Sequence, residues 1–107
     1  MEVNPYPVEV TERFRDHFKE IYEFLKANSY QSSQKLQKDI VDVVQDICER
    51  PTYHSVARIA QTKKIFRYAR IMKSYKVYFY VETERIIILD ILHERRNPSS
   101  TDYMEDL

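Results

Sequence analysis

The stretches that decide the fold are YKVYFYV at residues 75–81 and RIIILDILH at residues 85–93. The first alternates apolar with more polar side chains, and its apolar odd-numbered positions share one face, which is the pattern of a half-buried strand. The second is apolar at nearly every position, which is typical of a central strand buried on both faces. Glu-Thr-Glu at residues 82–84 lies between them and predicts a hairpin loop.

Two amphipathic helices are predicted earlier in the chain. Apolar residues recur every three or four positions over residues 11–28 and again over residues 32–49, which is the spacing of one buried helical face. Thr11 can cap the first helix, and Ser32 or Ser33 can cap the second. About four residues join the two helices, so they should form an antiparallel hairpin. The remaining predicted elements are strands near residues 3–10 and 63–72 and a loop over residues 51–62.

This order predicts an α+β fold, β-α-α-β-β-β, in which the helical hairpin packs on one face of a small, mostly antiparallel sheet. A single domain is expected over residues 3–98, followed by a polar tail at residues 99–107 that frays. The other face of the sheet is expected to stay partly open and to present Lys76, Tyr78 and Tyr80. The expected core consists of Phe14, Phe18, Ile21, Leu25, Leu36, Ile40, Val43, Val44, Ile47, Val77, Phe79, Ile88 and Leu89.

The composition excludes several classes of protein. Glycine is absent, which excludes a glycine-rich phosphate-binding loop. Cys48 is the single cysteine, so it forms no internal disulfide and is expected to be a small core residue. No CxxC or His/Cys pairing occurs, so neither a metal site nor a cofactor is expected. The sequence has no signal peptide and no apolar run of the ~20 residues that span a bilayer, so a cytoplasmic location without membrane contact is expected.

Acidic and basic residues are segregated along the chain. The protein is formally neutral, yet residues 51–81 contain no Asp or Glu, and aromatic residues are interleaved with their cations. Such a stretch attracts anions such as phosphate backbones or acidic peptides. The alternative is a solvated basic face that binds nothing. The seven cations of this stretch are Arg58, Lys63, Lys64, Arg67, Arg70, Lys73 and Lys76.

Two segments carry a resemblance to a known family, RYARIMKSYKVYFY at residues 67–80 and IIILDILHERRNP at residues 86–98. They contain an Arg-bearing strand, a turn, a strand with a Tyr-basic pair, and an apolar strand that ends in His and a basic pair. In this order, behind a helical hairpin, they resemble the RelE/ParE superfamily of bacterial toxins from type II toxin–antitoxin systems. The resemblance spans residues 3–98. It implies the fold predicted above and a protein partner, an antitoxin whose C-terminal segment wraps the toxin.

The resemblance implies one of two toxic activities. RelE-like members cut messenger RNA in the ribosomal A site without a metal, by attack of the 2′-OH, whereas ParE-like members poison DNA gyrase. For a nuclease, the matching catalytic candidates are Arg67, Lys76, His93, Arg95 and Arg96. The cations would stabilise the charge of the phosphorane and His93 would transfer a proton. Lys76 departs from the family, which commonly has Arg there, because an ammonium cannot make the bidentate phosphate contact.

The charge balance favours the ParE-like activity. Residues 1–50 carry ten acidic against seven basic residues, and the sequence pI is about 6.8, which weakens attraction to ribosomal RNA. The interpretation is a growth-inhibiting, ParE-like toxin that acts on a target such as DNA gyrase. A RelE-like mRNA endonuclease is the alternative, and a non-toxic, antitoxin-binding module is the third. Tyr103 is a further candidate for the C-terminal aromatic of RelE-like enzymes, while His17 and His54 are expected to be structural or solvated.

Overall fold

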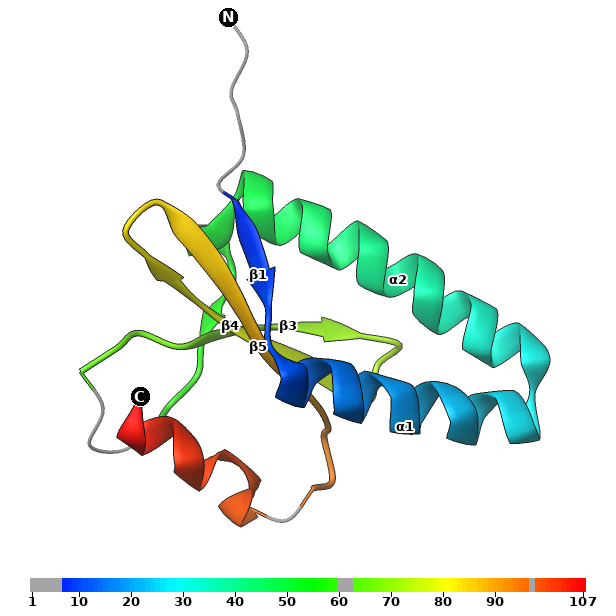
Figure 1. Cartoon of the computed structure of the whole chain (residues 1–107). Coiled ribbons are helices and arrows are strands. Elements are labelled where there is room, and N and C mark those ends of the chain that lie inside the picture. The colour runs from blue at the N-terminus through cyan, green and yellow to red at the C-terminus, as the bar shows by residue number, and fades with distance from the viewer. Residues whose placement is uncertain (1–6, 60–62, 97) are drawn as a thin grey trace, which may run out of the picture.

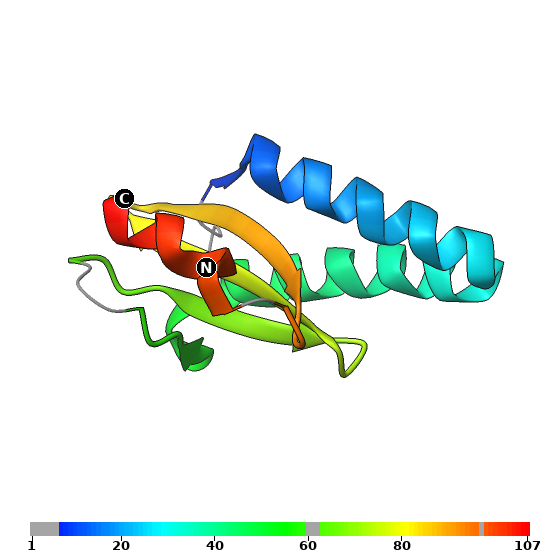
Figure 2. The same ribbon diagram turned by 90° about the horizontal axis from the view of Figure 1, so that it is seen from below.

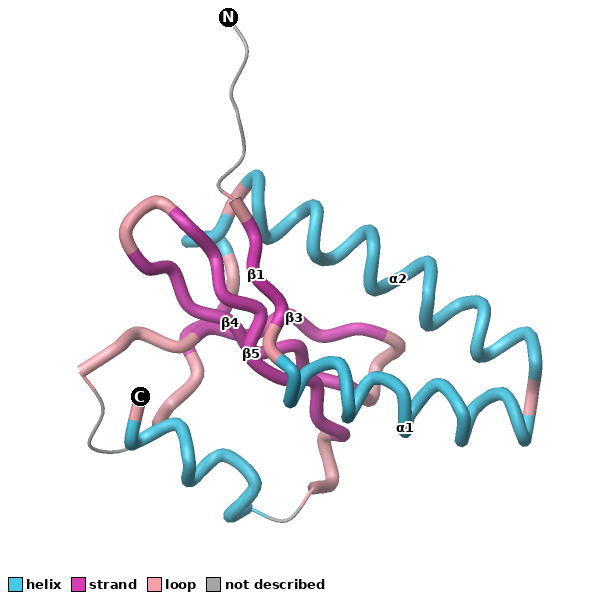
Figure 3. Tube along the Cα trace, in the orientation of Figure 1, coloured by secondary structure: helices cyan, strands magenta, loops and turns pink. Residues whose placement is uncertain are grey.

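The computed structural model describes residues 7–59, 63–96 and 98–107 (Figure 1). Figure 3 separates its helices from its strands along the same trace. The predicted α+β class is confirmed, as is the order of the two long helices and the main strands. The elements are β1 (Val8–Val10), α1 (Glu12–Asn28), α2 (Tyr30–Glu49), the 3-10 helix η1 (Pro51–Tyr53), β2 (Ser55–Val56), β3 (Arg67–Ile71), β4 (Tyr75–Glu82), β5 (Arg85–His93) and the 3-10 helix η2 (Pro98–Asp106).

The strands form one five-stranded sheet in the order β1-β5-β4-β3-β2. β1 runs parallel to β5, and the other three pairs are antiparallel. β5 therefore has a neighbour on both sides, and seven of its nine residues are buried, which confirms a central strand covered on both faces. The predicted first strand is confirmed at Val8–Val10, while residues 3–6 of that prediction lie outside the described residues.

The helical hairpin is tighter than predicted. Ser29 alone separates α1 from α2, and its extended backbone caps both helices. Its side chain accepts a hydrogen bond from the Ser32 N–H at 3.3 Å. The prediction that Ser32 or Ser33 caps α2 is wrong, because both lie inside the first turn and Ser29 already supplies the acceptor. Figure 2 shows the two helices side by side, with their far ends projecting beyond the sheet.

The apolar stripes of α1 and α2 pack on one face of the sheet, termed the helix face. Its core is completed by alternate residues of β4 and β5, and most of the predicted core residues lie there, buried or partly buried. Leu89 is the exception, because it is buried on the opposite face. Strand alternation after Ile88 points Leu89 away from the helices. β5 has one extra residue opposite the Tyr78–Phe79 step, and this β-bulge shifts the alternation of the residues that follow it.

The prediction that the opposite face, termed the second face, is partly open and presents Lys76, Tyr78 and Tyr80 is confirmed for Lys76 and Tyr80, which are half-buried, and is wrong for Tyr78, which is buried. η2 lies on the side of the sheet away from α2 (Figure 1), and Met104 is fully buried there against Tyr78, Leu89 and Leu92. The expectation that residues 99–107 fray is wrong, because a side chain of this segment fills the second, smaller core. Long-range packing of this kind leaves no periodic signal in a nine-residue polar tail.

The region between α2 and β4 differs most from the prediction. The strand expected near residues 63–72 is shorter and covers Arg67–Ile71. The loop expected at residues 51–62 contains η1 and the two-residue edge strand β2. Two residues are too few for an alternation pattern, so β2 is defined only by its pairing with β3.

The two tight turns of the β3–β4–β5 meander are built without glycine. Met72 and Lys73 have φ of 51° and 62°, and Thr83 and Glu84 have φ of 35° and 63°. Positive φ at two successive residues is the type I′ geometry that matches the twist of a hairpin. Because each of these residues has a Cβ, both turns carry backbone strain.

Candidate functional site

Three tyrosines on the second face each lie beneath a cation. Strand alternation places Tyr68 of β3 and Tyr78 and Tyr80 of β4 on this face. A cation lies within cation–π range of each ring. The pairs are Lys76 Nζ over Tyr68 at 4.5 Å, Arg96 Cζ over Tyr78 at 5.4 Å and Lys64 Nζ over Tyr80 at 4.5 Å. These six residues are termed the tyrosine–cation face.

Positive charge gathers at the end of this face where β4 begins. Lys76 lies directly opposite Arg70 across the β3–β4 pair, and Arg70 forms an ion pair with Glu94 after β5. Glu94 therefore pairs with Arg70, and Lys76 and Arg96 add two further cations on the same side of the sheet. The structure thus places two of the predicted site residues, Lys76 and Arg96, together on a surface that attracts anions.

A buried carboxylate joins α1, β5 and η2 beside this face. Asp90 is fully buried and accepts hydrogen bonds from the Tyr103 hydroxyl at 2.7 Å and the Ile91 N–H at 2.8 Å. His17 Nδ1 of α1 lies 2.5 Å from Asp90 Oδ1, the oxygen that also accepts from the Ile91 N–H, while Tyr103 donates to Oδ2. The Arg13 guanidinium stacks over the Tyr103 ring at 3.8 Å. These contacts pin η2 to the sheet and give His17 the structural role predicted for it.

Thr11 anchors the start of α1 at the same bulge. Its hydroxyl donates to the Leu89 carbonyl at 2.6 Å and accepts from the Phe14 N–H at 3.0 Å, which confirms its predicted cap role. α1 therefore starts at the β5 bulge, next to Asp90, which accepts the hydrogen bond from Tyr103 of η2. The bulge thus fixes the positions of α1 and η2 relative to β5.

Burial controls the chemistry of the phenols and of the single thiol. Burial raises the pKa of Tyr103, and the hydrogen bond to Asp90 raises it further. Burial also raises the pKa of Tyr78, although the Arg96 guanidinium opposes this. The raised pKa values keep both phenols neutral, and Tyr103 donates its proton in a hydrogen bond to Asp90. Burial, aided by Glu49, raises the pKa of the Cys48 thiol, which packs partly buried against the helix-face core and is a poor nucleophile.

Arg67 lies on the helix face, away from the tyrosine–cation face. Its partner across the β3–β4 pair is Phe79 of the helix-face core, and its guanidinium donates to the His54 carbonyl at 2.8 Å. The His54 ring packs edge-on against Phe79 at 5.7 Å. His54 Nε2 lies 3.0 Å from Asp46 Oδ2 of α2, although the two atoms do not have the geometry of a hydrogen bond. Arg67 and His54 therefore hold β2 against α2, the structural role expected of His54.

His93 also lies on the helix side of the sheet. The bulge at Leu89 reverses the alternation of every later residue of β5, so His93 pairs with Tyr75. The two rings meet edge-on at 5.2 Å, and His93 Nδ1 accepts from the Arg95 N–H at 2.9 Å. The expectation that His93 reaches the open face of the sheet is wrong for this reason. The Arg95 side chain is exposed in the turn that follows.

The five predicted site residues do not form one cluster. Arg67 and His93 lie on the helix face, and their partners on β4 are four residues apart, about 13 Å at ~3.3 Å per residue. Lys76 and Arg96 lie on the second face, and Arg95 lies in the exposed turn. RNA cleavage requires an acid, a base and anion-stabilising donors within reach of one phosphate. This arrangement does not bring these five residues to one phosphate.

Sequence reasoning missed Asp90, and it missed Lys64 and Tyr68 as partners on the tyrosine–cation face. A lone acid inside an apolar strand was the available signal for Asp90, because a buried carboxylate must find hydrogen-bond donors. Tyr103, a candidate aromatic of a nuclease, instead supplies one of these donors.

The described surface offers cations and the half-buried tyrosines Tyr68 and Tyr80 for binding. Residues 7–59, 63–96 and 98–107 contain no group of three or more His, Cys, Asp or Glu side chains that could hold a metal ion. In the same parts of the chain, none of the helices combines the length and the apolar character that crossing a bilayer requires.

Comparisons with known proteins agree with this architecture. A family model described as "ParE toxin of type II toxin-antitoxin system, parDE" matches residues 8–98. No curated protein matches the chain. The chain is similar to a solved chromosomal ParDE TA system from P. aeruginosa, with a TM-score of 0.67 and 16% identity over 82% of this chain and 95% of that one. It is also similar to the toxin-antitoxin complex RelBE2 from Mycobacterium tuberculosis, with a TM-score of 0.52 and 16% identity over 85% and 100%.

The two kinds of comparison carry different weight. At 16% identity the structural likeness shows the fold alone. The family model, in contrast, runs from β1 to the first residue of η2 and includes the helical hairpin and the whole sheet. The chain therefore belongs to the ParE toxin family of type II toxin–antitoxin systems, within the RelE/ParE superfamily.

Proposed function

We propose that this chain inhibits growth by binding DNA gyrase as its essential target, and that a cognate antitoxin neutralises it. The observation that carries the proposal is the division of the predicted catalytic residues between two faces of the sheet. A toxin that acts by binding needs an accessible surface of matching shape and charge, without a convergent acid and base. Membership of the ParE family supports the same choice.

Arg95 and Arg96 are the proposed contact residues for the target. Arg95 is exposed in the turn after β5, and the Arg96 guanidinium lies over the Tyr78 ring at the edge of the tyrosine–cation face. Arginine is enriched at the energetic centres of protein interfaces because it combines apolar contact with several hydrogen bonds. In this role, the loss of either guanidinium lowers the affinity for the target. It changes no reaction rate, because a toxin that acts by binding catalyses no reaction.

The proposed antitoxin carries an acidic, amphipathic segment. Residues 51–81 present seven cations without an acidic residue, and exposed apolar side chains lie among them. Charge complementarity speeds the association of such surfaces, and apolar contacts hold the complex together. Ordering a flexible segment costs several kcal/mol, so the interface should be large.

A RelE-like mRNA endonuclease is the second candidate function. The tyrosine–cation face favours it, because its cations suit a nucleotide's phosphate and the half-buried Tyr68 and Tyr80 lie beside them. The position of His93 on the helix side speaks against it. A non-toxic, antitoxin-binding module is the third candidate, since it needs the binding surface alone.

Induced expression with labelled thymidine and labelled methionine tests the proposal. We expect DNA synthesis to fall first, the cells to filament, and the purified chain to inhibit supercoiling by gyrase. The Arg95→Ala/Arg96→Ala double variant should lose toxicity, while His93→Ala should keep it. Arg15→Ala, at an exposed arginine of α1, serves as the matched control.

Other outcomes identify the other candidates. A first fall in protein synthesis, with cleaved ribosome-bound message in primer extension and with toxicity lost in His93→Ala, would replace this proposal with the RelE-like one. Normal growth of the expressing cells, together with tight binding of the antitoxin, would support the third candidate, the non-toxic, antitoxin-binding module.

A further inference from the structure

The edge strand β2 presents an unpaired backbone position. β2 is the last strand of the sheet and pairs antiparallel with β3, Ser55 opposite Tyr68 and Val56 opposite Arg67. The Ala57 N–H donates to the Phe66 carbonyl at 2.7 Å, so the hydrogen-bonded pairs of this ladder are those on either side of Val56. In an antiparallel ladder the residue between such pairs turns its N–H and C=O outward. Val56 therefore offers one donor and one acceptor at the free edge of the sheet.

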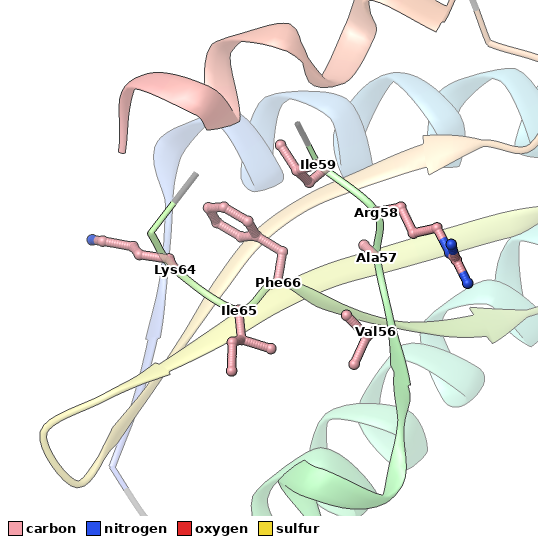
Figure 4. Close-up of a pocket in the computed structure, with 7 residues that line it drawn as sticks. All are labelled: Val56, Ala57, Arg58, Ile59, Lys64, Ile65 and Phe66. Atoms are coloured by element: carbon pink, nitrogen blue, oxygen red, sulfur yellow. The ribbon is translucent and has the colours of Figure 1, made fainter. Parts of the chain in front are cut away.

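Apolar side chains are exposed around this edge. Val56 is 53% exposed and Ile65 is 63% exposed, and their side chains point the same way (Figure 4). Both border a groove of about 510 Å³ formed by residues 56–59 and 64–66. Ile65 also borders a second hollow of about 400 Å³ that the exposed Val81 of β4 lines. A free edge with exposed branched apolar residues is a template for another strand.

The charge at this edge selects the kind of strand that fits. The Arg58 side chain lines the groove and points away from Phe66 (Figure 4). Lys63 and Lys64 line the second hollow, and Lys64 borders both. With no acidic residue between residues 51 and 81, an incoming acidic strand meets no repulsion from this stretch.

We infer that the β2 edge receives an extended, acidic segment of the antitoxin, which adds to the sheet as a sixth strand beside β2. One residue of this segment exchanges both backbone hydrogen bonds with Val56. A branched apolar side chain covers Val56 and Ile65, and flanking carboxylates meet Arg58 and Lys63. The inference rests on the proposed antitoxin partner and assigns its backbone contact.

Hydrogen exchange on the chain, free and co-purified with the product of the neighbouring small gene, tests the contact directly. The Ala57 amide should exchange slowly in both states, because it is already bonded to Phe66. The Val56 amide should be fast in the free chain and slowed at least tenfold in the complex.

Variants at the same position test its contribution to affinity. Val56→Pro deletes the outward N–H without breaking the ladder to β3, and should raise the Kd of the antitoxin about tenfold. Val56→Ala keeps the N–H and should have a smaller effect. Arg58→Glu should weaken binding most at low salt. Val41→Ala, at a valine of α2 that is 64% exposed, is the matched control and should leave the Kd unchanged.

The outcomes separate this inference from the proposed function. Tight binding with an unprotected Val56 amide and a normal Kd for Val56→Pro overturns the edge contact and leaves the antitoxin partner intact. A wild-type chain that binds no antitoxin overturns both. A free chain that is already dimeric, with Val56 protected, assigns the edge to a second copy and also overturns the inference. If Val56→Pro does not fold, the exchange measurement on the wild-type chain decides.

Discussion

Removing the Tyr103 hydroxyl should loosen η2 from the sheet. Tyr103→Phe deletes the 2.7 Å hydrogen bond to Asp90 and keeps a ring beneath Arg13. Asp90 retains its contacts with His17 and Ile91, so its carboxylate is not orphaned. A hydrogen bond to a charged group contributes about 1.5–3 kcal/mol. The free energy of unfolding should therefore fall by about 2 kcal/mol, and Tm should fall by roughly 8–16 °C in a domain of this size.

A double-mutant cycle isolates this bond from the rest of the junction. Asp90→Ala should lower the free energy of unfolding by about 4 kcal/mol, because it removes the acceptor of several buried donors. In that background Tyr103→Phe should change stability by less than about 0.5 kcal/mol, since the bond is already absent. The difference is a coupling energy of about 2 kcal/mol. Asp90→Asn keeps the shape of the site and replaces Asp90→Ala in the cycle if that variant does not fold.

Urea unfolding followed by far-UV circular dichroism measures these free energies by linear extrapolation. Tyr53→Phe, at a tyrosine that is 70% exposed, is the matched control and should leave stability unchanged. Equal effects of Tyr103→Phe in the wild-type and Asp90→Ala backgrounds would refute the reasoning, because the hydroxyl would then act independently of the carboxylate.

Two further predictions concern the turn between β4 and β5 and the buried phenols. Replacing Thr83 by Asn and Glu84 by Gly should raise the free energy of unfolding by about 1 kcal/mol in urea titrations, because both residues have positive φ and Asn-Gly relieves that strain; a less stable protein contradicts the turn assignment. The pKa values of Tyr103 and Tyr78 are raised above the ordinary 10.0 in the folded state, so the unfolded chain loses these protons first as pH rises. The contribution of these two phenols to stability should be constant below about pH 10 and fall above it by about 1.4 kcal/mol per pH unit for each tyrosine. Tyr103→Phe should remove one such contribution from the slope in alkaline urea titrations, and an unchanged slope contradicts the burial of this phenol.

The helices and the central strand were predictable because their signals are local. Apolar spacing of three and four residues defines α1 and α2, and the run of Ile and Leu defines β5. Every predicted core residue lies buried or partly buried against one of the two cores. Each pattern indicates which side of a helix or strand is apolar. This is enough to predict which side of a helix packs on the sheet.

The arrangement of the candidate site was not predictable, because it depends on one bulge and one docking event. Without the extra residue at Leu89, alternation along β5 would place His93 on the second face, beside Lys76. The position of η2 depends on Tyr103 reaching Asp90, thirteen residues away in the chain. Neither the bulge nor this contact produces a periodic pattern, so the sequence predicted one cluster of residues that the structure divides between two faces.

The most buried strand of the sheet, β5, is synthesised after the other four strands. β5 must insert between β1 and β4, and the Thr11–Leu89 contact beside the β1–β5 pair spans 78 residues. Translation adds roughly 5–20 residues per second, and pairings this distant close slowly. An unfinished chain therefore has a helical hairpin without its central strand and lacks the turn that carries Arg95. The surface that carries Arg95 therefore forms only after β5 has been synthesised, so a partner protein made beforehand can bind it as soon as it forms.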